Sequence, residues 1–215
     1  KAELRERLGL DRSWPEQYAD WLWGVVQGDF GTSLQGSERT VLEDLKTRIP
    51  VTMELGIIAV IVGASIAIPI GVYSAVRQDT MGDYSARSFA IFALAVPSFW
   101  AATLIIAIVI PKLGLPSIPI RYHGLFEDPV ENLKQMWIPG VILGVALGGA
   151  VMRLTRAQML EVLRQDYVRT AWAKGLQERH VVFRHATKNA LIPVITLIGL
   201  QVPVVVGGSV VLESI

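Results

Sequence analysis

The sequence predicts an all-α membrane protein with several spans, on the strength of its composition and its uncharged runs. Hydrophobic residues make up 52% of the 215 positions and charged residues 18%, with a mean hydropathy of +0.44. Soluble domains average about 25% charged residues. Four stretches contain no Asp, Glu, Lys or Arg: 55–76, 88–111, 135–152 and 189–212. Each falls within the roughly 17 to 25 residues that cross a hydrocarbon core, where only helices satisfy the backbone.

Lys and Arg are distributed unevenly among the segments that connect these runs. Segment 153–188 carries eight of them, against two in 77–87 and three in 112–134. Cytoplasmic loops are enriched in Lys and Arg, so we expect 153–188 in the cytoplasm. Alternation then places 77–87 inside and 112–134 outside. Residues 1–52 also fall outside, and they hold nine acidic against seven basic residues.

Residues 1–52 are the expected extracytoplasmic lead-in. Its export needs an earlier span, so we expect one helix before this sequence and a further one after it. Trp14, Trp21 and Trp23 suit a membrane interface, where the ring is buried and its N–H stays wet. A small helical hairpin with a tryptophan core explains them equally well, and the sequence leaves both alternatives open.

Prolines are expected to bend the first two spans. Pro69 with Gly71 predicts a kink near Ile66, and Pro97 predicts one near Leu94, because proline removes a backbone donor and crowds the preceding turn. Neighbouring helices can satisfy the freed carbonyls within a membrane. Such kinks either shape a pore wall or reflect irregular packing.

The third span carries a glycine ridge. Gly140, Gly144 and Gly148 recur every four residues, which places them on one helical face and lets a second backbone approach closely. The ridge therefore predicts a tight helix contact. Its partner lies either in this chain or in a second subunit.

The basic inner segment predicts two helices. The first is expected from Thr155 to Lys174, with a stripe at i, i+4 spacing formed by Met159, Leu163, Tyr167 and Ala171. Gly175 is a natural C-cap for it. A second basic helix then continues into the last span at Pro193. A plain topology-fixing loop explains the charge of this segment but not its small residues around Ala171.

Six motifs along the chain resemble those of permease subunits of ATP-binding-cassette importers, in the dipeptide, oligopeptide and nickel branch. Two lie in the inner segment: 169–175 (RTAWAKG) and 185–193 (HATKNALIP). The others are 28–34 (GDFGTSL), 48–55 (RIPVTMEL), 97–100 (PSFW) and 165–170 (QDYVRT). Each motif alone is weak, and together they are specific.

The resemblance implies the transmembrane fold of a type I importer. In it, 53–215 is the permease domain and 153–188 is the cytoplasmic coupling loop. A short helix around Ala171 to Gly175 would sit in a groove of a cytoplasmic ATPase and move with it, so that the rigid spans alternate between inward-facing and outward-facing states. The residues implied in coupling are Arg169, Thr170, Ala171, Trp172, Ala173, Lys174, Gly175, His185, Asn189 and Pro193.

The resemblance also implies partners and a location, the cytoplasmic (inner) membrane of a prokaryote. The partners are cytoplasmic ATP-binding subunits, a second homologous permease and an extracytoplasmic solute-binding protein. ATP and Mg would be bound by the ATPase, since this sequence has no Gly-x-x-x-x-Gly-Lys-Ser/Thr loop. Arg169 in place of the general Glu is typical of the peptide branch, whereas Trp172 stands where that branch usually has arginine.

Few other groups in the sequence could carry chemistry. The chain has no cysteine, and His123, His180 and His185 are too dispersed to form a metal-ligand set. No catalytic triad or carboxylate pair can be assembled, so we expect a non-enzyme without a cofactor of its own. Helix-to-helix hydrogen bonds are the simpler explanation for the polar residues of the spans. The same residues are the candidates to line a translocation path: Ser65, Ser98, Thr103, Thr196 and Gln201.

These inferences lead to one principal hypothesis and two alternatives. The principal hypothesis is a pore-forming permease subunit of an ATP-driven importer of di- or oligopeptides. The same importer class carrying nickel, glutathione or an oligosaccharide is one alternative, and a helical membrane scaffold or sensor that passes no solute is the other. The basic inner segment also suits anionic lipid headgroups, and nucleic acid binding is not expected because the segment lacks interleaved aromatic residues.

Overall fold

The computed structural model describes residues 12–32, 40–114 and 122–212, and these are helical apart from turns, loops and one isolated bridge. The chain divides into two compact units, Lys1–Val51 and Thr52–Ile215. Parts of the expected lead-in, 1–11 and 33–39, lie outside the described residues. Three described helices are long and apolar enough to cross a membrane, and a fourth span exists if one bent pair counts as a span. The prediction of an all-α membrane protein is therefore confirmed.

The first unit contains helix α2, Trp14–Val26. Ser13 precedes it, and the backbone N–H of Ser13 donates to the Glu16 carboxylate at 3.1 Å, which satisfies a donor at the helix start. Helix α2 has no buried residue within the described part of the chain. This argues against a tryptophan core, because Trp14, Trp21 and Trp23 are all exposed.

Helices α3 and α7 form the centre of the second unit. Helix α3 spans Val41–Val76 and stays helical through Pro69, and α7 spans Pro129–Leu163. A Cβ atom at Gly63 of α3 would lie 2.7 Å from the carbonyl oxygen of Gly144 of α7. Real Cβ atoms do not approach a backbone atom so closely, so the two backbones touch only because both residues are glycine.

The rest of the predicted glycine ridge also faces α3. A Cβ atom at Gly140 would lie 2.4 Å from Ile58, and one at Gly148 would lie 3.7 Å from the side chain of Ala67. The partner of the ridge is therefore a helix of this chain.

The second predicted span is divided by a 94° bend. Helix α4 ends before Val96, which is extended with φ −87° and ψ 119°, and Pro97 starts the second leg. The kink expected near Leu94 is therefore present, as a break between two helices: Pro97 cannot donate to the α4 ladder and forces the residue before it out of helical geometry. The elements of the pair are α4 (Met81–Ala95), α5 (Ser98–Leu104), the π-helical η1 (Ile105–Val109) and α6 (Ile110–Lys112).

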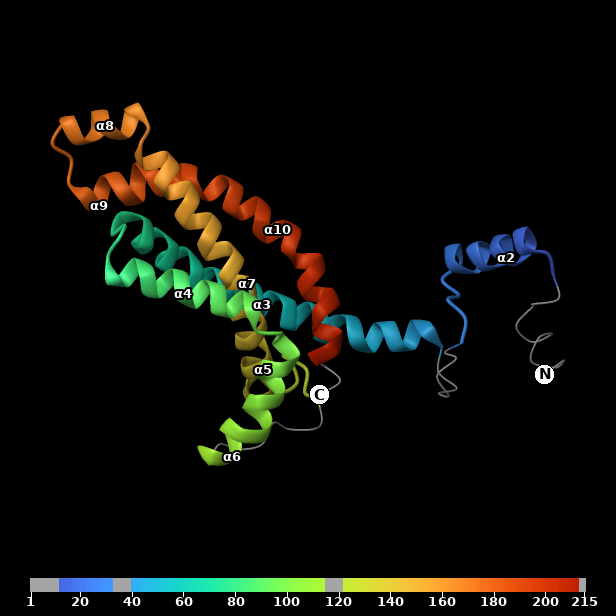
Figure 1. Ribbon diagram of the computed structural model, residues 1–215. Helices are drawn as coiled ribbons and strands as arrows, with labels where there is room; N and C mark the ends of the chain where they lie inside the picture. The colour runs from blue at the N-terminus through green and yellow to red at the C-terminus, as the bar shows by residue number, and fades with distance from the viewer. Residues whose placement is uncertain (1–11, 33–39, 115–121, 213–215) are drawn as a thin grey trace. The chain divides into compact units, whose positions relative to one another are not determined.

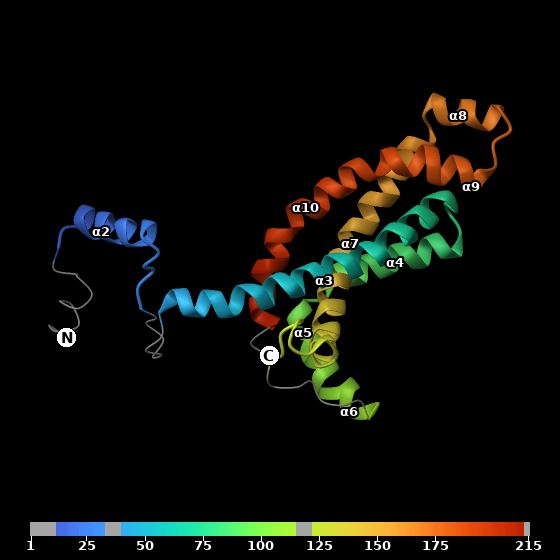
Figure 2. The ribbon, with the colours of Figure 1, turned by 180° about the vertical axis from the view of Figure 1, so that it is seen from behind.

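The inner segment leads from α7 back into the last span. Its elements are α8 (Asp166–Ala173), α9 (Glu178–His180), the π-helical η2 (Val181–Ala186) and α10 (Thr187–Leu212). Helices α8 and α9 lie at the same end of the second unit as the turn between α3 and α4, and α6 lies at the opposite end (Figures 1 and 2). The two segments predicted to share one side of the membrane, 77–87 and 153–188, thus lie at one end of the helices.

A short loop before α7 is fastened at the opposite end. The backbone N–H of His123 donates to Gln135 at 3.0 Å, and the Asn132 amide donates to the His123 carbonyl at 2.9 Å. The Tyr122 hydroxyl donates to the Glu54 carboxylate at 2.8 Å. Burial, and then the contact with the Glu54 carboxylate, raise the pKa of Tyr122 to about 12, so the phenol stays neutral.

Candidate functional site

Helix α8 is a short helix set apart from the spans that flank it. Gln165 precedes it with an extended backbone, φ −71° and ψ 148°, and Asp166 in the first turn suits the positive end of the helix. The helix stops at Lys174, and Gly175 follows with φ +76°. Only glycine adopts this left-handed conformation without strain, so Gly175 ends α8 as a C-cap residue should.

The inward face of α8 is apolar and fully packed. Val168 and Ala171 form a buried cluster with Val181 of η2, and the partly buried Val162 and Leu163 of α7 pack against it. Side chains on three elements thus close around one small core. Any displacement of α8 must carry these neighbours with it or break the cluster.

A second buried cluster continues from this core into the bundle. Val182 of η2 packs with Met159 of α7 and with Val72 of α3, together with Ala75, Ala186 and Ala190. Met159 is fully buried. The inner ends of α3, α7 and α10 are therefore joined directly behind α8.

A polar contact links α8 to the start of α10. The Asn189 side-chain amide donates to the Tyr167 hydroxyl at 2.7 Å, and the Tyr167 hydroxyl donates to the backbone carbonyl of His185 at 3.4 Å. Tyr167 lies on α8, whereas the other two residues lie at the junction of η2 and α10. This contact adds a polar link to the apolar cluster on the inward side of the helix.

The outward face of α8 is open. Arg169, Thr170, Trp172 and Ala173 are all exposed, and Trp172 is 42% exposed. Phe183 of η2 is 60% exposed on the same segment. Exposed apolar side chains beside cations are typical of a surface that receives another protein. A hollow of about 320 Å³ adjoins it, lined by Gln177, Arg179, His180, Phe183 and Arg184.

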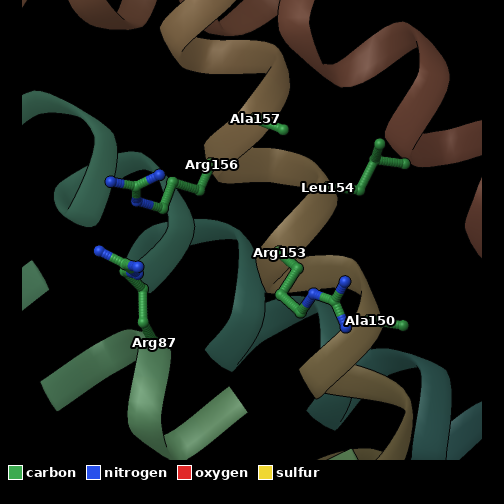
Figure 3. Close-up of a pocket in the computed structure, with 6 residues that line it drawn as sticks. All are labelled: Arg87, Ala150, Arg153, Leu154, Arg156 and Ala157. Atoms are coloured by element: carbon green, nitrogen blue, oxygen red, sulfur yellow. The ribbon is translucent and has the colours of Figure 1, made fainter. Parts of the chain in front are cut away.

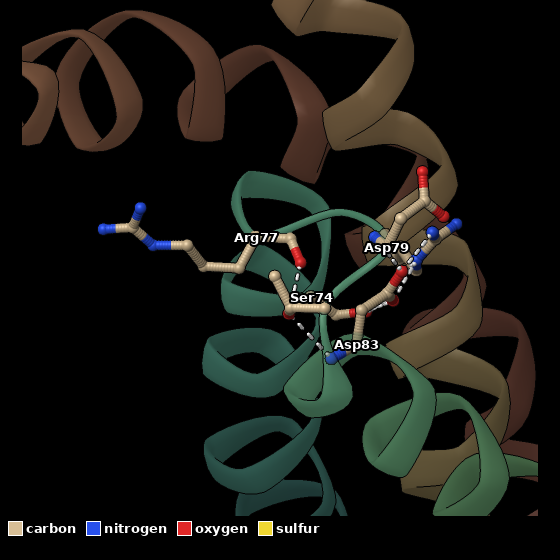
Figure 4. A network of polar contacts seen from close by, with 6 residues as sticks. Ser74, Arg77, Asp79 and Asp83 are labelled. Atoms are coloured by element: carbon tan, nitrogen blue, oxygen red, sulfur yellow. Dashed lines mark hydrogen bonds and ion pairs between the residues drawn. The ribbon is translucent and has the colours of Figure 1, made fainter.

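A buried ion pair holds the inner ends of α3, α4 and α7 together. Arg156 of α7 donates to both oxygens of Asp83 of α4, each at 2.8 Å, and its Nε also donates to Ser74 of α3 at 3.1 Å. The side chain of Asp83 is fully buried. Figure 4 shows the side chains converging between the helices, while Arg77 extends away from them. The Ser74 hydroxyl and the backbone N–H of Asp79 also donate to Asp83, so each oxygen of the buried carboxylate accepts two hydrogen bonds.

The sequence comparisons agree with this architecture. Residues 67–215 match the family described as "Binding-protein-dependent transport system inner membrane component". The chain belongs to this family of transport permeases.

Three relatives of the permease span its whole sequence. The oligopeptide transport system permease protein AppB of Bacillus subtilis is 38% identical over 100% of this chain and 68% of its own length. The dipeptide transport system permease protein DppB of Escherichia coli K12 is 34% identical over 100% of this chain and 69% of its own length. The dipeptide transport system permease protein DppB of Alkalihalophilus pseudofirmus is 36% identical over 100% of this chain and 70% of its own length. The resemblance to the peptide branch of importer permeases is confirmed.

The structure changes two details of the predicted coupling segment of the permease. The single helix expected over Thr155–Lys174 was wrong, because α7 ends at Leu163 and α8 begins at Asp166. The short helix expected around Ala171 to Gly175 lies earlier, at Asp166–Ala173, and Ala171 is buried on its inward side. The small size of Ala171 therefore serves packing against the permease itself.

Other predicted coupling residues lie around the same junction. Lys174 and Gly175 are exposed at the end of α8, and Asn189 and the His185 carbonyl make the contact to Tyr167. Pro193 lies inside α10, one turn beyond Asn189. The rings of His180 and His185 stand 6.0 Å apart.

The polar residues predicted to line a path lie on three helices, α3, α5 and α10. The hydroxyls of Thr103 and Thr196 donate to carbonyls of their own helices, at Phe99 and Ile192. Ser65, Thr103 and Thr196 are exposed, while Ser98 and Gln201 are partly buried. Within the described part of the permease, no group of three or more His, Cys, Asp or Glu side chains could hold a metal ion.

Sequence reasoning missed the Asp83–Arg156 pair entirely. The two residues are 73 positions apart, and each follows or precedes an uncharged run, where a lone charge looks like an ordinary interfacial residue. The available signal was their distance from the uncharged runs. Asp83 lies about one helical turn before the run that begins at Ser88, and Arg156 lies about one turn after the run that ends at Met152. Both segments were predicted to lie on the same side of the membrane.

Proposed function

We propose that this permease is a pore-forming subunit of an ATP-driven importer of di- or oligopeptides. The names of its relatives support peptides over nickel, glutathione or oligosaccharides as cargo. The observation that carries the coupling role is the construction of α8: one face is clamped to α7, η2 and α10, and the other is open and partly apolar. A helix built in this way can receive a displacement from outside and pass it inward.

The proposed mechanism follows these contacts. Cytoplasmic ATP-binding subunits would bind ATP and Mg and hold α8 by its outward face at Trp172 and Lys174. When they close, α8 would move with them and shift the buried clusters at Val181 and Val182. Because glycine contacts and the Asp83–Arg156 pair leave no slack between α3, α4 and α7, these helices would then tilt as one body.

The remaining parts of the assembly belong to the same proposal. A second homologous permease would complete the translocation path, and an extracytoplasmic solute-binding protein would deliver the peptide. The permease domain would comprise residues 53–215, with 153–188 in the cytoplasm and 1–52 outside. The placement of α8 and the α3–α4 turn at one end of the helices supports this topology.

The absence of cysteine from the sequence makes the topology directly testable. Lys174→Cys places a single thiol on the proposed cytoplasmic surface, and Phe126→Cys places one in the loop before α7, where Phe126 is 98% exposed. A membrane-impermeant maleimide should label Phe126→Cys in right-side-out vesicles and Lys174→Cys only in inverted ones. The opposite pattern would remove the coupling role from α8.

The coupling role itself is tested in the reconstituted importer. Trp172→Asp on the outward face should abolish ATP-dependent peptide uptake while leaving insertion of the permease intact. Phe126→Asp, an equally drastic change at the other end, is the matched control and should retain uptake of peptide. Unchanged uptake with Trp172→Asp, or a Lys174→Cys thiol that crosslinks to no ATPase, would contradict the proposal.

A further inference from the structure

A cationic hollow opens between α4 and α7 on the flank of the bundle. It measures about 530 Å³ and is lined by Arg87 of α4 and by Ala150, Arg153, Leu154, Arg156 and Ala157 of α7. Its volume lies within the range of small-molecule sites. In Figure 3 the guanidinium groups of Arg87 and Arg156 lie on one side, and that of Arg153 lies on the other. Three arginine side chains thus line the hollow, and the rest of its lining is apolar.

The three arginines of the hollow differ in whether a carboxylate already neutralises their charge. Arg156 is fixed by the buried carboxylate of Asp83. Arg87 and Arg153 are exposed and have no ion pair with any residue that the structure describes. Two guanidinium groups therefore remain available at the rim, beside a third that is held rigidly.

The depth of the hollow in the membrane follows from the sequence. Arg87 immediately precedes the uncharged run that begins at Ser88, and Arg153 immediately follows the run that ends at Met152. The Arg87 guanidinium also stands 5.6 Å from the ring of Tyr84, a residue type enriched at membrane interfaces. The rim of the hollow thus lies at the level of lipid phosphates, and its apolar wall faces the acyl region.

We propose that this hollow binds the headgroup of an anionic phospholipid. Guanidinium groups match phosphate oxygens with paired N–H donors, so Arg87 and Arg153 would hold the phosphodiester. Leu154 and Ala150 would contact the glycerol and upper acyl carbons. Basic pockets between membrane helices recognise lipid headgroups on these grounds. The site is separate from α8, and it requires neither the proposed cargo nor the proposed ATPase.

The test titrates phosphatidylglycerol into the delipidated full-length permease in neutral detergent, with the bound fraction read by native mass spectrometry. Arg87→Gln and Arg153→Gln should each weaken binding about fivefold, and the double variant correspondingly more. The matched control is Arg77→Gln with Arg164→Gln, two exposed arginines at the same end that do not line the hollow. The control should bind as the wild type does. Arg156 stays untouched, because its removal would strand Asp83.

Four results would overturn the inference. Equal losses in the test and control variants would indicate general charge attraction, and no loss in either would leave the hollow without a role. Displacement of the lipid by inorganic phosphate at similar concentration would identify a soluble anion as the ligand. If the double variant, purified together with its partner subunits, loses the second permease while its lipid binding is unchanged, the hollow is a subunit interface. Melting curves matching those of the wild type show that the variants are folded.

Discussion

Two helix junctions of the second unit, α3 with α7 and α8 with the bundle, are built on different principles. Between α3 and α7 the backbones approach closely at glycines, with little space left for a side chain to rearrange. Between α8 and the bundle, three small apolar side chains and one tyrosine make the contact, and the other face of α8 is bare. The first junction holds the helices together as one rigid body. The second joins that body to α8, whose outward face is free to bind a partner.

This difference locates where motion can occur. Close-packed backbones have few alternative arrangements, so changes of conformation are expected at the surfaces of the body and not within it. The comparison predicts that substitutions in the body cost stability. Substitutions at α8 should reduce transport more than they reduce stability.

The largest effect is expected at the Asp83–Arg156 pair. Arg156→Leu leaves a fully buried carboxylate without its charged partner, which costs about 3–5 kcal/mol of folding free energy. Thermal unfolding of the purified permease measures it, with Arg77→Leu, which removes an exposed arginine nearby, as the control. Converting both members to apolar residues, Asp83→Leu with Arg156→Leu, should restore part of the loss. If Arg156→Leu is as stable as the control, the pair does not hold the body together.

The next effect is expected on the glycine ridge, where position decides the outcome. Gly144→Ala would place a Cβ atom 2.9 Å from the Ala59 carbonyl oxygen, and Gly63→Ala would place one 2.7 Å from that of Gly144. Each should destabilise the permease by about 1–3 kcal/mol. Gly148→Ala is the matched control, since its Cβ would meet its nearest atom at an ordinary 3.5 Å. Similar melting temperatures for all three would show that α3 and α7 pack less closely than described.

A smaller effect is expected at the end of α8. Gly175→Ala forces a side chain into the left-handed region at φ +76° without any steric clash, because no atom lies within 4 Å of the new Cβ. The local cost is about 1–2 kcal/mol. Uptake should fall while global melting changes little, because the strain distorts only the turn. Gly175→Asn, which tolerates this conformation better, should retain more uptake than Gly175→Ala.

The smallest effect is expected for Tyr167→Phe. It removes the hydroxyl that receives the Asn189 amide and keeps the ring. The loss is about 0.5–1.5 kcal/mol and falls at the low end because Tyr167 is exposed. The ratio of peptide transported to ATP hydrolysed is the sensitive measurement. A ratio equal to that of the wild type would leave the apolar cluster as the sole connection between α8 and the bundle.

Much of this architecture was predictable because it depends on local patterns. The uncharged runs reveal the spans, the four-residue spacing of Gly140, Gly144 and Gly148 reveals a contact face, and Gly175 reveals the end of a helix. The helix that the ridge faces was not predicted, although Ala59, Gly63, Ala67 and Gly71 of α3 repeat with the same spacing. Two matching small-residue ridges are a stronger signal than either alone.

The remaining features depend on distant or competing interactions. The i, i+4 stripe from Met159 to Ala171 suggested one helix. The break between α7 and α8 falls at Arg164 and Gln165, and neither is a glycine or proline that would have marked it. The side of α8 that Ala171 occupies is set by Val181, which comes later in the chain. The pairing of Asp83 with Arg156 likewise requires the fold.

The two neighbouring valines of η2 have a mechanical consequence. Val181 belongs to the cluster beneath α8, and Val182 belongs to the cluster of the bundle. Neighbouring residues of one helical segment therefore anchor the two hydrophobic cores, and Val162 and Leu163 of α7 pack against both. Because no linker separates the two cores, we expect a shift of the core beneath α8 to displace η2 and the start of α10 as well.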